Sequence, residues 1–393
     1  MYYLIFFCIL AFFSFLEMED KMNPTLKDRV YFFLFLLFWL TAGLRFETGV
    51  DWPGYTTFYT DIEGINNFDF QFSYLFKYSE FEFGYAVLNS IFRTITSNIQ
   101  LLFLFIAFIT NLMLFKSIKK YSDHIIVSLL IYYSTIYFVL DLSGIRQCIA
   151  LNIFLISLDS IYKKEFLKYI LLIILATLFH TTALFLIPMY FLLNRKFKNV
   201  VYIIFIIIGV LISFIQITWL LFIINSFTGF FQLDAITSKL ISYSYRGDTR
   251  NFGIGFVFNI LLFVFYLIKR NKLESNKMFT IFLNSYMMSF FFYYYTWELS
   301  EFSSRFRLYF FIANIFLLSY LIDIYNEKLK RHLLFLFIIS FSIFYSRIYI
   351  FQMNEGIAYN PYQNYVIYEL FDLNSTGYQR LDEFSRTFDS SNE

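Results

Sequence analysis

Apolar runs separated by short charged clusters cover most of the chain, and this pattern is typical of helices that cross a membrane. Several runs are shorter than the roughly 20 residues that a helix needs to span a bilayer, so some segments are expected to be short or re-entrant. The twelve runs lie near residues 2–16, 30–44, 99–115, 124–140, 145–162, 169–179, 181–193, 199–224, 252–268, 278–296, 306–325 and 333–351. The pattern predicts an all-α fold, a polytopic bundle of about twelve transmembrane segments.

The composition supports this class of protein. Hydrophobic residues make up 59% and charged residues 15% of the 393 positions. Soluble domains are about 25% charged, so this chain has too few charges to cover the surface of a soluble enzyme, and a disordered chain and a coiled coil are excluded as well. We predict one integral membrane domain, 1–351, and an outer tail, 352–393, that either folds against the outer loops or is disordered.

Lysine and arginine indicate the orientation of the segments, because cytoplasmic loops carry an excess of both. Basic clusters occur at alternate boundaries, which places these loops inside and both termini outside. The segment 169–193 has a cluster at each end, so it must go out and return, turning near His180. The clusters begin at Lys21, Lys116, Lys163, Arg195, Lys269 and Lys328.

The two sides differ in the kind of basic residue. This topology places 15 Lys and 4 Arg inside but 2 Lys and 10 Arg outside. A planar guanidinium can bind phosphate or carboxylate in a bidentate manner, whereas the plainer alternative is arginine that extends to the membrane interface. His180 joins the outer arginines, at a depth where polar groups are costly unless they are used. Four outer arginines lie at or near the ends of spans: Arg45, Arg146, Arg305 and Arg307.

The long outer loop, 46–98, carries two acidic candidates. Pro53 suits the first turn of a helix that begins near Asp51, and this helix would hold the Asp51 carboxylate close to the Tyr55 hydroxyl. Alternatively, Asp51 only caps the helix. Further on, Glu82 is either the structural partner of Ser79 in a capping box or a second acid/base candidate at the outer surface.

Several kinds of chemistry lack a sequence signal. The chain has no P-loop, no D-x-D triplet, no H-E-x-x-H motif and no cysteine–histidine cluster. Its two cysteines lie inside apolar runs, where they form neither a disulfide framework nor a metal motif. We therefore expect no ATP, no metal ion, no other cofactor and no nucleic-acid partner.

Four short blocks in order carry a resemblance to a known family. The chain is similar to the EpsG-like membrane proteins, a branch of the Wzy-type O-antigen and exopolysaccharide polymerases. The similarity is good from 40 to 195 and weak elsewhere, and Thr182 stands where the family often has Ser, which retains the hydroxyl. The blocks are Gly43-Leu44-Arg45 through Gly49-Val50-Asp51 to Tyr55; Glu82-Phe83-Gly84-Tyr85 with Leu88-Asn89; Arg146-Gln147-x-Ile149-Ala150 with Ala176 to Phe179-His180-x-x-Ala183-Leu184; and Arg305 with Tyr309-Phe310.

The resemblance implies a GT-C-like membrane glycosyltransferase, a polysaccharide polymerase of the inner (cytoplasmic) membrane whose active site faces the periplasm or exterior. Its substrates would be oligosaccharide repeats linked to polyprenyl (undecaprenyl) pyrophosphate, and its product O-antigen of lipopolysaccharide, capsule or exopolysaccharide. A flippase, a chain-length regulator and membrane lipids would be its partners.

We expect the site to divide into a phosphate clamp, a base and sugar-binding rings. The clamp would consist of Arg146 and Arg305, with Arg45 and Arg307 as further binding residues. The base would be Asp51 or His180, with Glu82 as the second-rank acid/base candidate. Trp52 and Tyr55 would stack on sugar faces.

Two other functions would also place arginine near the outer surface. A transporter or flippase for polysaccharide or lipid-linked sugar is expected to have two related halves, and the sequence shows no convincing similarity between its halves. A membrane acyltransferase or glycosyltransferase that decorates surface glycan would add one group per acceptor and build no chain.

Overall fold

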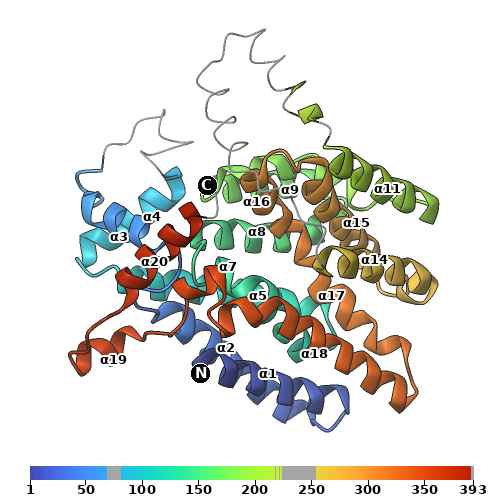
Figure 1. Ribbon diagram of the computed structural model, residues 1–393, viewed down its shortest axis with the longest axis horizontal. Coiled ribbons are helices and arrows are strands. Elements are labelled where there is room, and N and C mark those ends of the chain that lie inside the picture. The colour runs from blue at the N-terminus through green and yellow to red at the C-terminus, as the bar shows by residue number, and fades with distance from the viewer. Residues whose placement is uncertain (69–80, 217, 221, 224–253, 391–393) are drawn as a thin grey trace. The chain divides into compact units, whose positions relative to one another are not determined.

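The computed structural model describes residues 1–68, 81–216, 218–220, 222–223 and 254–390. Within these residues the chain is helical (Figure 1). The one pairing of extended backbone in this part of the chain is an isolated bridge between Arg45 and Asn364. The predicted all-α fold is confirmed. The chain forms two compact units: the first contains Met1–Pro188 and the stretch from Leu318 onward, and the second contains Met189–Leu317.

The first unit carries most of the helices, and α17 (Ala313–Tyr320) crosses the boundary between the units. Its N-terminal elements are α1 (Tyr2–Met18), α2 (Pro24–Gly43), α3 (Trp52–Asp61), α4 (Phe83–Ile95), α5 (Gln100–Tyr121), α6 (Ile125–Tyr132), the π-helix η2 (Tyr133–Tyr137), α7 (Phe138–Leu140), α8 (Ile145–Tyr162), α9 (Phe166–Thr177) and the 3-10 helix η3 (Thr181–Leu186). Its C-terminal elements are η5 (Ile322–Ile324), α18 (Lys328–Ile350), η6 (Asn354–Ala358), α19 (Tyr365–Leu370) and α20 (Gly377–Ser390).

The second unit contains six described elements, of which α15, the π-helix η4 and α16 lead to Arg305. These elements are α10 (Met189–Leu192), α11 (Asn199–Ile215), α14 (Ile254–Leu273), α15 (Phe279–Phe290), the π-helix η4 (Phe291–Tyr295) and α16 (Ser300–Phe311).

Four of the described helices are long and apolar enough to cross a membrane: α5, α8, the run Ser300–Ile324 and α18. Five shorter apolar helices have 10–17 residues, among them Ile125–Leu140 and the pair Phe166–Thr177 and Thr181–Leu192 on either side of His180. The protein is therefore a membrane protein. The number of about twelve transmembrane segments remains a prediction.

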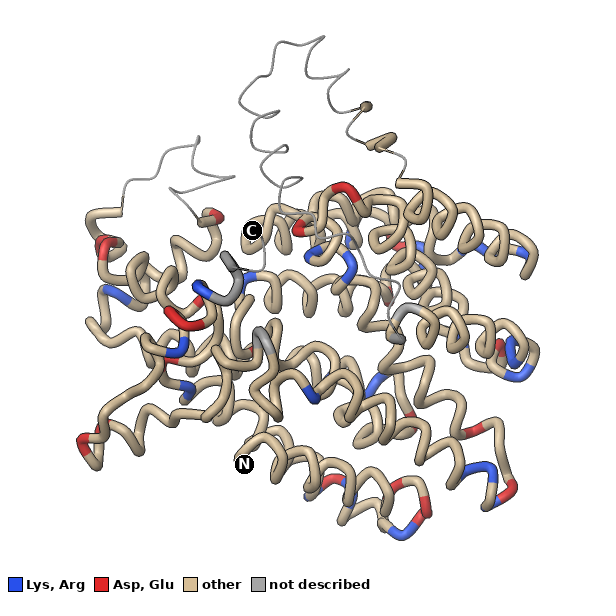
Figure 2. The backbone as a smooth tube through the Cα atoms, in the orientation of Figure 1, with Lys and Arg blue, Asp and Glu red and all other residues tan. Residues whose placement is uncertain are grey.

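The charged ends of the helices in the first unit are held by specific contacts. The buried Glu17 carboxylate accepts hydrogen bonds from Ile126 N at 2.8 Å and Val127 N at 3.0 Å, so it caps the start of α6. Lys27 pairs with the same carboxylate at 2.9 Å. Figure 2 shows that Lys, Arg, Asp and Glu lie mainly at helix ends and in loops, as the pattern of apolar runs requires.

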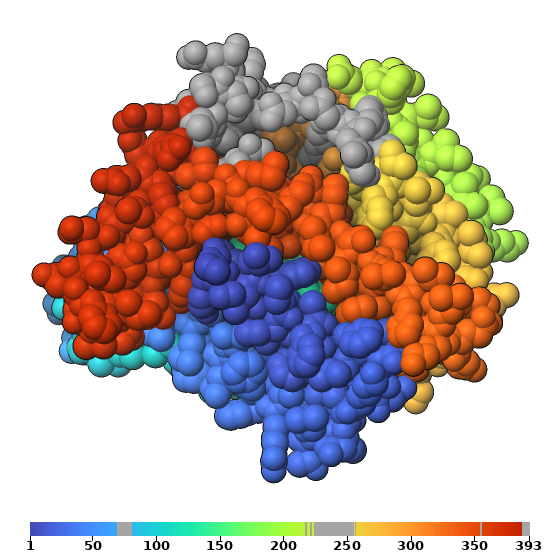
Figure 3. Space-filling view, turned by 60° about the horizontal axis from the view of Figure 1, so that its bottom comes forward, coloured from blue at the N-terminus to red at the C-terminus, as the bar shows by residue number. Residues whose placement is uncertain are grey.

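The C-terminal segment folds against the end of α2. Phe46 N donates to Gln363 O at 2.9 Å, and Tyr365 N donates to Leu44 O at 2.8 Å. Arg380, on α20, donates to Glu47 O at 3.1 Å. Figure 3 shows this segment, in red, against the N-terminal helices in blue. The tail was expected either to fold against the outer loops or to be disordered, and its described part is folded against the start of loop 46–98.

Candidate functional site

Glu82 connects three elements of the first unit. It stands directly before α4, and its side chain makes no capping bond to that helix. One carboxylate oxygen accepts from Arg146 Nη1, and the other accepts from Thr181 N at 3.1 Å. The capping-box interpretation is wrong for Glu82, because this residue occupies the N-cap position instead of the third helical position; Ser79 lies outside the described residues.

Arg146 is the second residue of α8, where the helix dipole is positive. Its guanidinium lies 4.4 Å from the centre of the Phe81 ring and 5.9 Å from that of Tyr55. The side chain is 18% exposed, so solvent reaches part of it. Its buried Nε has no hydrogen-bond partner among the described residues. Arg146 therefore has a donor to spare beside its bond to Glu82.

Asp51 and Tyr55 lie beside this pair. The Asp51 side chain is exposed and does not cap α3, so the plain capping alternative is wrong, although its backbone N donates to Ser143 Oγ at 3.1 Å. Burial, and next the charge of Asp51, raise the pKa of Tyr55 to about 12. Arg146, which hydrogen-bonds the Tyr55 hydroxyl, opposes this shift. The hydroxyl stays protonated at neutral pH.

Two glycines allow the loops to approach this closely. Gly49 has φ +98°, and a Cβ there would lie 2.0 Å from Leu142 O, so the loop before Asp51 presses against the turn before α8. At Gly84 a Cβ would lie 2.7 Å from Leu178 O, while Gly84 N donates to that oxygen at 2.8 Å. These contacts bring the starts of α3 and α4 to the Arg146 end of α8 and to the turn after α9.

His180 occupies the turn between α9 and η3, as the sequence predicts. Its backbone is extended, and its ring is buried, with Nδ1 hydrogen-bonded to Thr182 Oγ1. The next residue, Thr181, binds Glu82. One residue thus separates His180 from the pair of Glu82 and Arg146.

Arg45, Trp52 and Tyr55 lie in the interior of the loop region. Arg45 is 1% exposed, donates to Ala42 O at 2.8 Å and lies 4.4 Å from the Phe103 ring centre; burial lowers its pKa. A cation at this position stabilises the carboxyl end of α2. Arg45 and the Trp52 and Tyr55 rings are therefore enclosed by protein in this arrangement.

Arg305 and Arg307 belong to the second unit. Arg305 is 46% exposed and pairs with Glu301, one turn earlier on α16, at 2.5 Å. The Arg307 guanidinium lies 4.8 Å from the Tyr293 ring centre and 4.7 Å from that of Phe311. The first unit by itself therefore brings together Asp51, Tyr55, Glu82, Arg146 and His180.

Asp141 is a buried acid that the sequence analysis missed. It lies in the turn between α7 and α8, where Tyr132 Oη donates to it at 2.5 Å and Asn111 Nδ2 at 3.3 Å. Burial raises its pKa to about 7, and the charge of Arg45 acts in the opposite direction. Asp141 could have been found in the sequence, because an acidic residue directly after a long apolar run is conspicuous. Among the described residues no three His, Cys, Asp or Glu side chains lie close enough to hold a metal ion.

Comparison with known protein families gives a match over most of the chain. The sequence model of the EpsG family matches residues 28–364, a range that contains every candidate residue named above. No curated protein and no solved structure matches the chain.

Proposed function

Because the chain belongs to the EpsG family, whose members are Wzy-type polymerases, we propose that it polymerises oligosaccharide repeats linked to polyprenyl pyrophosphate. The reaction takes place at the outer face of the inner membrane and yields O-antigen, capsule or exopolysaccharide. The family supports a role in polysaccharide biosynthesis in general. The observation that favours this reaction is the pair of Arg146, which is 18% exposed, and the buried Glu82, in the same region as the exposed carboxylate of Asp51.

The proposed reaction transfers the growing glycan. The hydroxyl oxygen of the incoming repeat forms a bond to the anomeric carbon of the donor, and the bond from that carbon to the pyrophosphate breaks. The lipid diphosphate leaves with the electron pair, and the hydroxyl proton goes to a base of the protein. Departure of the diphosphate drives the step, so no nucleotide is required.

Arg146 neutralises the charge that grows on the leaving diphosphate. Its Nε, which has no hydrogen-bond partner within the described part of the chain, and its place in the first turn of α8 both favour an anion. In the absence of substrate, Glu82 compensates the guanidinium, because a largely buried cation without a partner is costly. Glu82 also keeps its bond to Thr181, which orients the pair. Glu82 therefore positions Arg146.

Asp51 is the preferred base. Its carboxylate is exposed, it makes no capping bond, and a Cβ built on Gly144 would lie 3.9 Å from its Oδ2. An acceptor hydroxyl could therefore reach it close to the start of α8. His180 is the alternative base, but its ring is buried and bonded to Thr182. Arg305, exposed on the second unit, is a further phosphate-binding candidate.

The test is the surface glycan of a deletion strain complemented with Arg146→Lys, separated on a gel. We expect material with a single repeat, because one point charge cannot reproduce the planar fork. The matched control is Arg93→Lys, since Arg93 also lies in the outer loop region, near the Tyr59 ring at 5.8 Å, but away from Glu82. Full ladders from the Arg146→Lys strain would contradict the proposal that Arg146 binds the donor diphosphate.

The same gel distinguishes the other functions in the deletion strain itself. A polymerase defect leaves glycan of one repeat, a flippase defect leaves none, and loss of a decorating enzyme leaves full ladders. A purified reaction sharpens the result: vesicles with the protein and a lipid-linked repeat should release lipid diphosphate in step with chain growth.

A further inference from the structure

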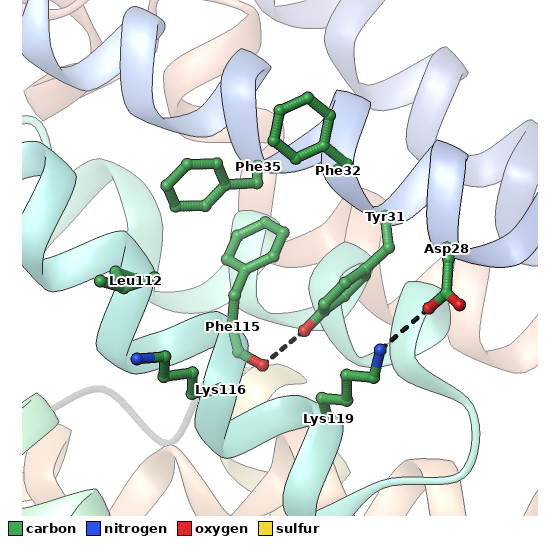
Figure 4. Close-up of a pocket in the computed structure, with 8 residues that line it drawn as sticks. All are labelled: Asp28, Tyr31, Phe32, Phe35, Leu112, Phe115, Lys116 and Lys119. Carbon is green, nitrogen blue, oxygen red and sulfur yellow. Dashed lines mark hydrogen bonds and ion pairs between the residues drawn. The ribbon is translucent and has the colours of Figure 1, made fainter.

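A groove between α2 and α5 lies at the lysine-bearing ends of these helices. Its volume is about 330 Å³. It belongs entirely to the first unit and contains none of the residues proposed for polymerisation. The groove is lined by Asp28, Tyr31, Phe32, Phe35, Leu112, Phe115, Lys116 and Lys119 (Figure 4).

The wall of the groove is apolar. Tyr31 Oη donates to Phe115 O at 2.6 Å, so the one hydroxyl in the wall is already satisfied. The Phe35 and Phe115 rings meet edge to face at 5.4 Å, and Phe32 on the same helix is exposed. What remains for a ligand is ring and alkyl surface, which suits hydrocarbon better than sugar or nucleotide.

The edge of the groove is positively charged. Lys116 and Lys119 lie one turn apart on α5, and Figure 4 shows both on the side opposite Phe32 and Phe35. Lys119 pairs with Asp28 at 2.9 Å. Lys116 is exposed and has no ion-pair partner in the described part of the chain. Two cations against one carboxylate leave a net positive charge beside the apolar wall.

We propose that this groove binds one anionic phospholipid of the cytoplasmic leaflet. An acyl chain lies against Phe32, Phe35 and Leu112, and the phosphate group lies at Lys116 and Lys119. Basic pockets between membrane helices on the cytoplasmic side bind anionic headgroups by this combination of charge and hydrocarbon. The lysine clusters place this end of α5 inside the cell. The proposal is independent of the reaction at Arg146.

The experiment measures lipid retained by the full-length protein. Purified protein is equilibrated with dioleoyl-phosphatidylglycerol or with dioleoyl-phosphatidylcholine, and bound lipid is counted by native mass spectrometry. We expect one phosphatidylglycerol to remain bound where phosphatidylcholine is lost. Lys116→Gln should weaken phosphatidylglycerol binding about fivefold, the effect of one lysine near an anionic leaflet.

Two further variants separate the groove from general surface charge. Lys198→Gln is the matched control, an exposed lysine at another predicted inner boundary, and should leave binding unchanged. Leu112→Trp fills the groove without changing the charge and should also weaken binding, at an unchanged melting temperature. The proposal is overturned if both lipids are retained equally, if Lys198→Gln acts like Lys116→Gln, or if Leu112→Trp binds normally, which would indicate a free phosphate site without an acyl chain.

Discussion

Arg146 and Arg305 stand in similar local settings in the two units, but their surroundings differ. Each lies on a helix that follows an apolar helix with a π-helical segment near its end, η2 in the first unit and η4 in the second. In each case the connection carries a buried acid, Asp141 or Glu298. π-helical segments occur frequently at functional sites. The shared order of elements was not visible as sequence similarity between the halves.

The difference lies in the partner. Arg146 is mostly buried and pairs with Glu82, which lies 64 positions away on another element. Arg305 is 46% exposed and pairs with Glu301 on its own helix. An exposed pair at this spacing contributes only about 0.3–0.5 kcal/mol, whereas breaking a buried pair is costly. The comparison teaches that the tertiary partner, not the local pattern, determines how strongly each arginine is held.

The largest effect is expected from Arg146→Lys. Loss of the bidentate guanidinium at the leaving diphosphate should reduce polymer formation roughly 100-fold. This is comparable to removing an oriented hydrogen-bond donor that stabilises the transition state in other enzymes. Chain growth in vesicles is the measurement, with protein amount and melting temperature as checks. Activity within threefold of the unsubstituted protein would show that Arg146 is a structural residue only.

The second effect concerns the stability of the same pair. Glu82→Ala leaves the guanidinium of Arg146 without its carboxylate and should lower the free energy of unfolding by about 3–5 kcal/mol. Glu301→Ala, the counterpart on α16, should cost less than about 0.5 kcal/mol. Thermal unfolding in detergent measures both, and equal losses would remove the contrast between the two arginines.

The third effect separates function from stability at Arg305. Since its pair with Glu301 is local and exposed, Arg305→Ala should change the melting temperature little. If Arg305 binds the donor phosphate, polymer formation should fall roughly tenfold, the size expected for one charge-assisted hydrogen bond. Glu301→Gln should keep full activity. An unchanged ladder from Arg305→Ala would restrict the clamp to the first unit.

The last effect is a pH dependence at Asp141. Folding raises the pKa of this acid to about 7, so the folded state binds a proton that the unfolded state has already lost. The contribution is favourable at low pH, and the free energy of unfolding should fall as pH rises from about 4 to about 7. Asp141→Asn should make the free energy of unfolding less dependent on pH over this range. The melting temperatures of the variant and the unsubstituted protein should then differ by a few degrees at one end of the range.

Asp382→Asn is the control for this measurement, because Asp382 is exposed on α20. It should leave the slope as it is in the unsubstituted protein. If Asp141→Asn and Asp382→Asn behave alike, burial of Asp141 does not determine the pH dependence.

The candidate residues show how far local pattern reaches. Glu82, Arg146 and His180 could be selected from the sequence, because charged or polar residues at the ends of apolar runs are conspicuous. Arg45 carried the same signal, and Trp52 was selected as a sugar-binding ring of the outer loop, yet both side chains are buried. The sequence suggested an exposed loop around them. In the structure the aromatic side chains of this loop pack on one another and on Phe103, whose ring centre lies 4.8 Å from that of Trp52, and they form a small core.

The sequence by itself determined the fold class, the membrane location and the division into apolar spans and charged ends. These depend on hydrophobicity and charge summed over neighbouring residues, and they need no knowledge of the partners. Only the tertiary structure decided that Glu82 meets Arg146 and that the tail covers the end of α2. Such contacts depend on close packing between distant segments, here allowed by the absence of a side chain at Gly49 and Gly84.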